Sequence, residues 1–101
     1  MVTHSVTIPR EEIIAFCQRY PIRKLALFGS VLRDDFRSDS DIDVLVEFIS
    51  ESGVTYLDMV TMQDELAAIL GRSVDLVTPG ALSQYFRQYV LETAETIYER
   101  E

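Results

Sequence analysis

Apolar stretches with the period of a helix alternate along this chain with shorter stretches that have the period of a strand. This succession constrains the fold more than any other feature, because each element needs an apolar surface to pack on. The expected helices cover residues 10–20, 55–70 and 82–97. The expected strands cover residues 25–28, 41–48 and 74–77. We therefore predict an α/β (α+β) fold in which a small mixed β-sheet is flanked by helices.

Each expected helix presents a row of apolar residues that should face the sheet. In the first helix this row contains Ile13, Phe16, Cys17 and Tyr20, and Pro21 stops the helix. In the second it contains Tyr56, Met59, Val60, Leu66, Ala67 and Leu70, and Gly71 ends the helix. In the last it contains Leu82, Tyr85, Phe86, Tyr89, Val90 and Ile97.

The length and charge of the chain limit its functions. Its 101 residues suffice for one compact domain, which we expect to span residues 1–101. A formal charge of −8 argues against direct nucleic-acid binding, because such proteins gather Lys and Arg on one face. No apolar run reaches the ~20 residues of a membrane helix. The single cysteine, Cys17, cannot form an internal disulfide, so we expect a cytoplasmic protein without a membrane partner.

Two aspartates stand at the start of the strand at 41–48. Residues i and i+2 of a strand point to the same face, so Asp41 and Asp43 should present two carboxylates side by side. Without a cation the two charges would repel each other. Mg²⁺ prefers one or two carboxylates together with waters and substrate phosphates. The pair therefore predicts a Mg²⁺ site.

Asp75 interrupts the otherwise apolar strand at 74–77 and is the third candidate carboxylate. If this strand lies beside the one at 41–48, the three acids converge and could hold two ions, as in two-metal phosphoryl or nucleotidyl transfer. Asp75 could also take the proton of an attacking hydroxyl. Its predicted roles are therefore metal ligand and catalytic base.

Gly29-Ser30 follows a predicted strand directly. Glycine allows the backbone to approach a phosphate closely, and Ser30 adds a hydroxyl donor. Arg33, one helical turn further on, could contact a phosphate or pair with Asp34 or Asp39. These three residues are the candidate nucleotide-binding residues.

Each of these features also has an ordinary structural explanation. Two aspartates on a strand are commonly solvated carboxylates, Gly-Ser is commonly a turn, and an aspartate inside a short strand often marks an exposed edge. Arg33 and Arg72 are by default surface side chains. Only the combination, in the order strand, turn, helix and strand, points specifically to phosphate chemistry.

The combination resembles the minimal nucleotidyltransferase (MNT) antitoxins of the DNA polymerase β superfamily. The resemblance lies in LALFGSVLR at 25–33, in SDSDIDVLVEF at 38–48, in GRSVDLV at 71–77 and in the ending VLETAETIYE at 90–99. The family signature is Gly-Ser, a spacer of about ten residues, Asp-x-Asp and a third acid on a later strand. The resemblance covers nearly the whole chain.

The resemblance implies a polymerase β-like fold, Mg²⁺ (two ions) and ATP as substrate. It makes Asp41, Asp43 and Asp75 the catalytic and metal-binding acids, and Gly29 and Ser30 the residues that hold the triphosphate. It further implies transfer of AMP to a tyrosine hydroxyl of a helical HEPN ribonuclease toxin, within a type VII-like toxin–antitoxin module. Asp34 departs from the family, since many relatives have glycine there, but no catalytic group is lost.

Two other functions remain open at this point. The protein could neutralise its toxin by binding and occlusion alone, with residues such as Tyr85 and Tyr89 at the interface. It could also modify a small-molecule acceptor, although relatives that do so usually carry an additional domain. Loss of Asp41 or Asp43 separates the catalytic hypothesis from occlusion.

Overall fold

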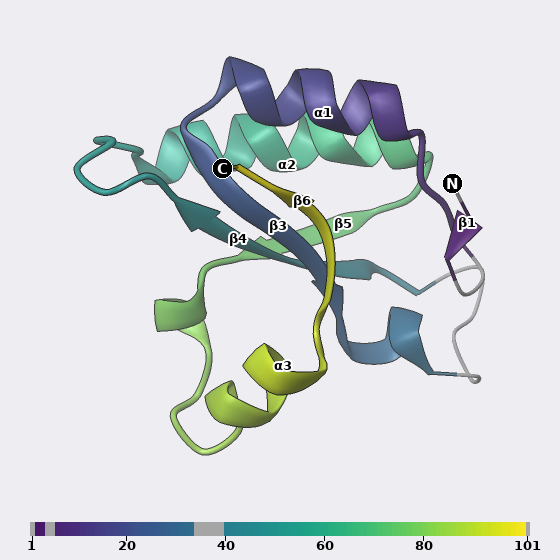
Figure 1. The fold of residues 1–101 in the computed structure, drawn as a ribbon, viewed down its shortest axis with the longest axis vertical. Coiled ribbons are helices and arrows are strands. Elements are labelled where there is room, and N and C mark those ends of the chain that lie inside the picture. Colours follow the sequence, from purple (N-terminus) through teal and green to yellow (C-terminus); the bar gives the residue numbers. More distant parts are fainter. Residues whose placement is uncertain (1, 4–5, 34–39, 101) are drawn as a thin grey trace.

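The computed structural model describes residues 2–3, 6–33 and 40–100 of the chain (Figure 1). Its α-helices are α1 (Arg10–Arg19), α2 (Tyr56–Leu70) and α3 (Arg87–Thr93). Single turns of 3₁₀-helix, η1 and η2, cover Gly29–Leu32 and Pro79–Ala81. The strands are β1 (Val2–Thr3), β2 (Val6–Thr7), β3 (Ile22–Phe28), β4 (Ile42–Phe48), β5 (Val74–Val77) and β6 (Glu95–Glu99).

A four-stranded mixed sheet with the order β5-β4-β3-β6 forms the centre of the molecule. β4 pairs parallel to β5, whereas β3 pairs antiparallel to both β4 and β6. β1 and β2 form a separate two-stranded antiparallel ladder. The predicted mixed sheet is confirmed, and β4 and β5, the strands expected to carry the acids, are direct neighbours.

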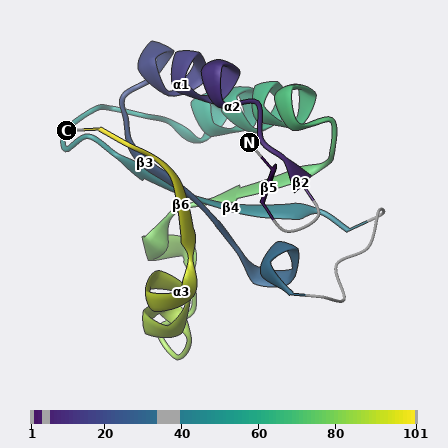
Figure 2. The same cartoon turned by 45° about the vertical axis from the view of Figure 1, so that its right-hand side comes forward.

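Helices α1 and α2 cover one face of the sheet, as Figure 2 shows. The alternation of β4 directs Ile42, Val44 and Val46 into this layer, where all three are fully buried. From the helices, Ile13, Phe16, Cys17, Met62, Leu66 and Leu70 complete the core. The Tyr20 hydroxyl donates to the Glu65 carboxylate over 2.8 Å, which ties α1 to α2.

A smaller apolar cluster covers part of the opposite face. It consists of Ala26, Leu45, Leu82 and Val90, so η2 and α3 pack beneath β3 and β4. Arg87 fastens this segment, because its guanidinium donates to the carbonyls of Pro79 and Leu82, each over 2.8 Å. Asp43 alternates with the buried Val44 and therefore lies on the α3 side of the sheet.

The predicted last helix is wrong at both ends. Helix α3 begins only at Arg87, and Tyr85 and Phe86 of the predicted apolar row precede it and are exposed. Helix α3 stops at Thr93, and residues 95–99 form β6, an edge strand paired with β3. Ile97 therefore packs against the α1–α2 layer instead of continuing the apolar row of α3. The segment Thr96-Ile97-Tyr98 is rich in β-branched and aromatic residues, which favour a strand. It forms a strand instead of extending the helix because it can pair with the edge of β3.

The predicted apolar row of α2 is only partly correct. Met62, Leu66 and Leu70, spaced four residues apart, face the sheet, whereas Tyr56 is 79% exposed and Val60 is also exposed. At 3.6 residues per turn, Tyr56 and Val60 lie roughly 80° and 120° around the helix from the buried row. Apolar spacing alone did not tell which of two adjacent rows meets the sheet.

The boundaries of α2 follow from its caps. Thr55 accepts a hydrogen bond from the Asp58 backbone N–H, and the Asp58 carboxylate accepts one from the Thr55 backbone N–H. Gly71 ends the helix in the left-handed conformation with φ +69°. In the described part of the chain, no helix is long and apolar enough to cross a membrane.

Candidate active site

The turn after β3 meets β4 at Asp43. Phe28, the last residue of β3, is the register partner of Asp43, so the chain turns at Gly29 directly beside the Asp43 side chain. Gly29 has φ +76°, and a Cβ atom placed there would lie within 3.0 Å of Oδ2 of Asp43. Glycine is required here both by its backbone conformation and by the closeness of the carboxylate.

Ser30 fixes the Asp43 side chain from the same turn. Its backbone N–H donates a hydrogen bond to the Asp43 carboxylate. The following residue, Val31, is fully buried in the main core and so anchors the 3₁₀ turn. The structure thus brings Gly29, Ser30 and Asp43 together, whereas Asp34 lies outside the described residues.

Two of the three predicted acids lie side by side on β4 and β5, and Asp41 lies just before the start of β4. Asp43 and Asp75 are register partners on the two parallel strands, and Asp41 precedes Asp43 by two residues. Asp41 and Asp75 are exposed, whereas Asp43 is half-buried. Burial raises the pKa of Asp43, and the negative charges of Asp75 and Asp41 raise it further, while Arg33 and the Ser30 N–H act in the opposite direction.

Two hydrogen bonds set the relative position of the segments that bear these acids. The Arg72 guanidinium donates to the carbonyl of Ser40, next to Asp41, over 2.9 Å. The Ile42 N–H donates to the carbonyl of Ser73, also over 2.9 Å. The sequence predicts Arg72 to be an ordinary surface residue, and no feature of it indicates this role, which depends on β5 returning beside β4.

The carboxylates suit a divalent cation in part. Within residues 2–3, 6–33 and 40–100, no group of three or more Asp, Glu, His and Cys side chains is arranged so that it could hold a metal ion, so the predicted three-carboxylate site is not formed here. Mg²⁺ does not need one, because it commonly takes one or two carboxylates and completes its shell with waters and substrate phosphates. The negative charges of Asp75 and Asp41 repel that of Asp43, and a cation bound at Asp43 would offset this repulsion.

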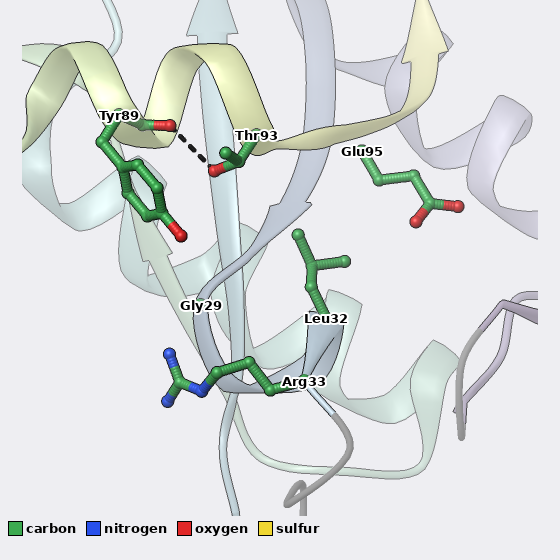
Figure 3. A pocket seen from close by; sticks show the side chains of 6 residues that line it. All are labelled: Gly29, Leu32, Arg33, Tyr89, Thr93 and Glu95. Carbon is green, nitrogen blue, oxygen red and sulfur yellow. Dashed lines mark hydrogen bonds between the residues drawn. The ribbon is translucent and has the colours of Figure 1, made fainter.

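A cavity of about 350 Å³ opens beside this turn, between η1 and α3. Gly29, Leu32 and Arg33 line one side, and Tyr89, Thr93 and Glu95 line the other (Figure 3). The exposed Arg33 thus lines a cavity that adjoins the candidate phosphate-binding turn at Gly29. Sequence reasoning did not select Thr93 or Glu95, since neither belongs to a recognisable motif.

Comparison with protein families and curated relatives agrees with this geometry. Residues 11–101 match the family described as Polymerase beta, Nucleotidyltransferase. The protein adenylyltransferase MntA of Thermococcus cleftensis is 35% identical over 81 residues, which cover 80% of this chain and 78% of that protein.

Solved structures share the fold. A toxin–antitoxin complex with AMP-PNP matches with a TM-score of 0.72 at 22% identity, covering 92% of this chain and 75% of that one. The complex of a tri-AMPylated Shewanella oneidensis HEPN toxin with an MNT antitoxin matches with a TM-score of 0.63 at 22% identity, covering 90% and 70%. The predicted nucleotidyltransferase fold is therefore confirmed.

Proposed function

This chain belongs to the polymerase beta nucleotidyltransferase family, and on that premise we propose that it transfers AMP from ATP to a tyrosine hydroxyl of a HEPN ribonuclease toxin. It thereby acts as the antitoxin of a type VII-like toxin–antitoxin module. The chain is a nucleotidyltransferase enzyme. We propose in addition that ATP is the nucleotide, Mg²⁺ the metal, a tyrosine hydroxyl the acceptor and a HEPN ribonuclease the partner.

One observation carries the proposal. The Gly29–Ser30 turn packs on Asp43, and Asp43 stands in register with Asp75 on the neighbouring strand. The turn proposed to bind phosphate thus lies beside Asp43 and its register partner Asp75. The charges would be unfavourable for a purely structural cluster, but they suit a cation and a polyphosphate.

The residues have the following proposed roles. Gly29 and the Ser30 hydroxyl hold the triphosphate, and Arg33 pairs with its negative charge. Asp41, Asp43 and Asp75 would hold Mg²⁺, which when bound neutralises charge on the phosphates and orients the α-phosphate. Two residues have positioning roles. The Ser30 N–H holds the Asp43 carboxylate, and Arg72 holds the backbone at Ser40, next to Asp41.

The proposed reaction is a displacement at the α-phosphorus of ATP. The tyrosine oxygen forms a bond to this phosphorus while the bond to the bridging oxygen of the β-phosphate breaks, and pyrophosphate leaves with the bonding electrons. Asp75 accepts the phenolic proton. Because Asp75 is exposed, the proton can pass on to water.

The relatives support the choice of acceptor and partner. The Thermococcus cleftensis protein bears the name protein adenylyltransferase, and the Shewanella oneidensis complex holds an AMPylated HEPN toxin. AMP-PNP in a further related complex supports an adenine nucleotide as substrate. The net charge of −8 also favours association with the basic cleft of a ribonuclease.

Intact mass spectrometry of the partner tests the proposal. The HEPN ribonuclease from the neighbouring gene is co-expressed with this protein or with its Asp41→Asn/Asp43→Asn variant. The unaltered protein should add one or more AMP units, and the variant should add none while keeping its melting temperature. Asp64→Asn is the matched control, because it removes an exposed carboxylate from α2 and should leave the transfer unchanged.

Neutralisation by occlusion is the second candidate. It is favoured by exposed apolar side chains ahead of and within α3: Tyr85 is 89% exposed, and Phe86 and Leu91 are also exposed. In that case the Asp41→Asn/Asp43→Asn variant would still co-purify with an unmodified ribonuclease and inhibit it. The same co-expression therefore decides between the two.

A further inference from the structure

We propose that the cavity between η1 and α3 binds the nucleoside part of the nucleotide, with the base stacked on the ring of Tyr89. This inference rests on the proposed function, since it takes a nucleoside triphosphate as the ligand. It goes beyond that function by assigning the end of the nucleotide that the Gly-Ser and Asp-x-Asp motifs leave without a binding surface.

The cavity has the right size and position. Its volume of about 350 Å³ lies within the roughly 300–1,000 Å³ of small-molecule sites. Gly29 lines it and is also the residue that packs against the Asp43 carboxylate. A triphosphate held at this turn therefore has the cavity directly beside it.

Charge sets the direction in which the nucleotide lies. Arg33 lines the cavity on the side of the Gly29 turn, and Glu95 lines it on the far side, after α3 (Figure 3). A phosphate is attracted to the first and repelled by the second. The uncharged nucleoside therefore belongs on the side of Tyr89 and Thr93.

The backbone of Tyr89 is anchored to the rest of the fold. Its neighbour Val90 is buried in the cluster beneath the sheet, which anchors α3. The Thr93 hydroxyl donates to the Tyr89 carbonyl over 2.8 Å and closes this turn of the helix. The residue Tyr89 is 68% exposed, and Figure 3 shows its ring directed from α3 toward the Gly29 turn and the Arg33 side chain.

Tyr85 provides an internal comparison. It precedes Tyr89 by four residues and is even more exposed, but it does not line the cavity. Exposure of an aromatic ring is therefore not what distinguishes Tyr89. Its place at the cavity wall is the distinguishing feature, and the two tyrosines form a matched pair for experiment.

Calorimetric titration of the full chain with Mg²⁺ and either ATP or tripolyphosphate tests the inference. Tyr89→Leu should weaken ATP binding about 5- to 150-fold, because stacking on an aromatic ring contributes that much per base. Tripolyphosphate, which has no nucleoside, should bind Tyr89→Leu and the unaltered protein equally. Tyr89→Phe should keep ATP affinity, and Tyr85→Leu should bind both ligands as the unaltered protein does.

Equal ATP affinity of Tyr89→Leu and Tyr85→Leu would overturn the inference while leaving the proposed function in place. The inference also fails if Tyr89→Leu weakens only the complex with the ribonuclease, since Tyr89 would then be a partner contact. If the unaltered protein binds neither ATP nor tripolyphosphate in the presence of Mg²⁺, the proposed function fails together with the inference.

Discussion

Replacing Gly29 by alanine should impair catalysis far more than stability. Gly29 has φ +76°, and an alanine Cβ would lie within 3.0 Å of Oδ2 of Asp43. The carboxylate must therefore move by about 1 Å to reach ordinary van der Waals distance. That movement weakens the hydrogen bond from the Ser30 N–H and displaces a proposed metal ligand.

The two effects have different magnitudes. A left-handed conformation disfavours a residue with Cβ by about 1–2 kcal/mol. Alanine also lowers the conformational entropy of the unfolded chain, which stabilises the folded protein by about 0.4–1 kcal/mol and so offsets part of this loss. The net loss of about 1 kcal/mol lowers the melting temperature of a domain of this size by roughly 4–8 °C. A misplacement of about 1 Å can reduce the rate of a transfer reaction about 100-fold.

Gly71→Ala is the matched control. Gly71 has φ +69°, and an added Cβ would meet nothing within 4 Å, so the variant has the same backbone strain without the collision. Both variants should lose similar stability in thermal melts followed by circular dichroism. Only Gly29→Ala should lose about 100-fold in the rate of AMP transfer to the ribonuclease. If the two variants transfer AMP at similar rates, the reasoning about Asp43 is refuted.

Three further outcomes follow from contacts outside the site. Burial raises the pKa of the Cys17 thiol to about 12, so the thiol loses its proton at a lower pH in the unfolded state than in the folded state. The free energy of unfolding should therefore fall as the pH rises from about 9 to about 12. Cys17→Ala should reduce this fall, measured by urea titration, by up to about 1.4 kcal/mol per pH unit. Arg100→Met should destabilise the protein by about 1–3 kcal/mol in the same assay, because the guanidinium donates to the carbonyls of Cys17, Tyr20 and Ile22; unchanged stability would contradict this. Thr55→Ala should lose about 1 kcal/mol, since it removes the cap of α2, and an unaltered urea midpoint would show that the cap contributes nothing.

The sequence by itself determined the parts of the site that depend on local geometry. Asp43 lies on the side of β4 away from α1 and α2 because the side-chain period of a strand is two residues, and Ile42 and Val44 select the buried side. Asp41, predicted on the same strand, lies just before it. Gly29 marks the sharp turn because few other residues adopt a positive φ there. Apolar periodicity likewise predicted α1, β4, α2, β5 and the later part of β3, but not the start of β3 at Ile22 or the ladder of β1 and β2.

Only the tertiary structure decided the parts that depend on which surfaces meet. The residues of β6 became a strand because β3 had an open edge, and Arg72 became a positioning residue because β5 returned beside β4. Tyr85 and Tyr89 have the same residue type and a helical spacing of four, yet of the two only Tyr89 lines the cavity. Local periodicity gives the direction of a side chain from its own element, whereas the packing of α3 against the sheet determines what that side chain faces.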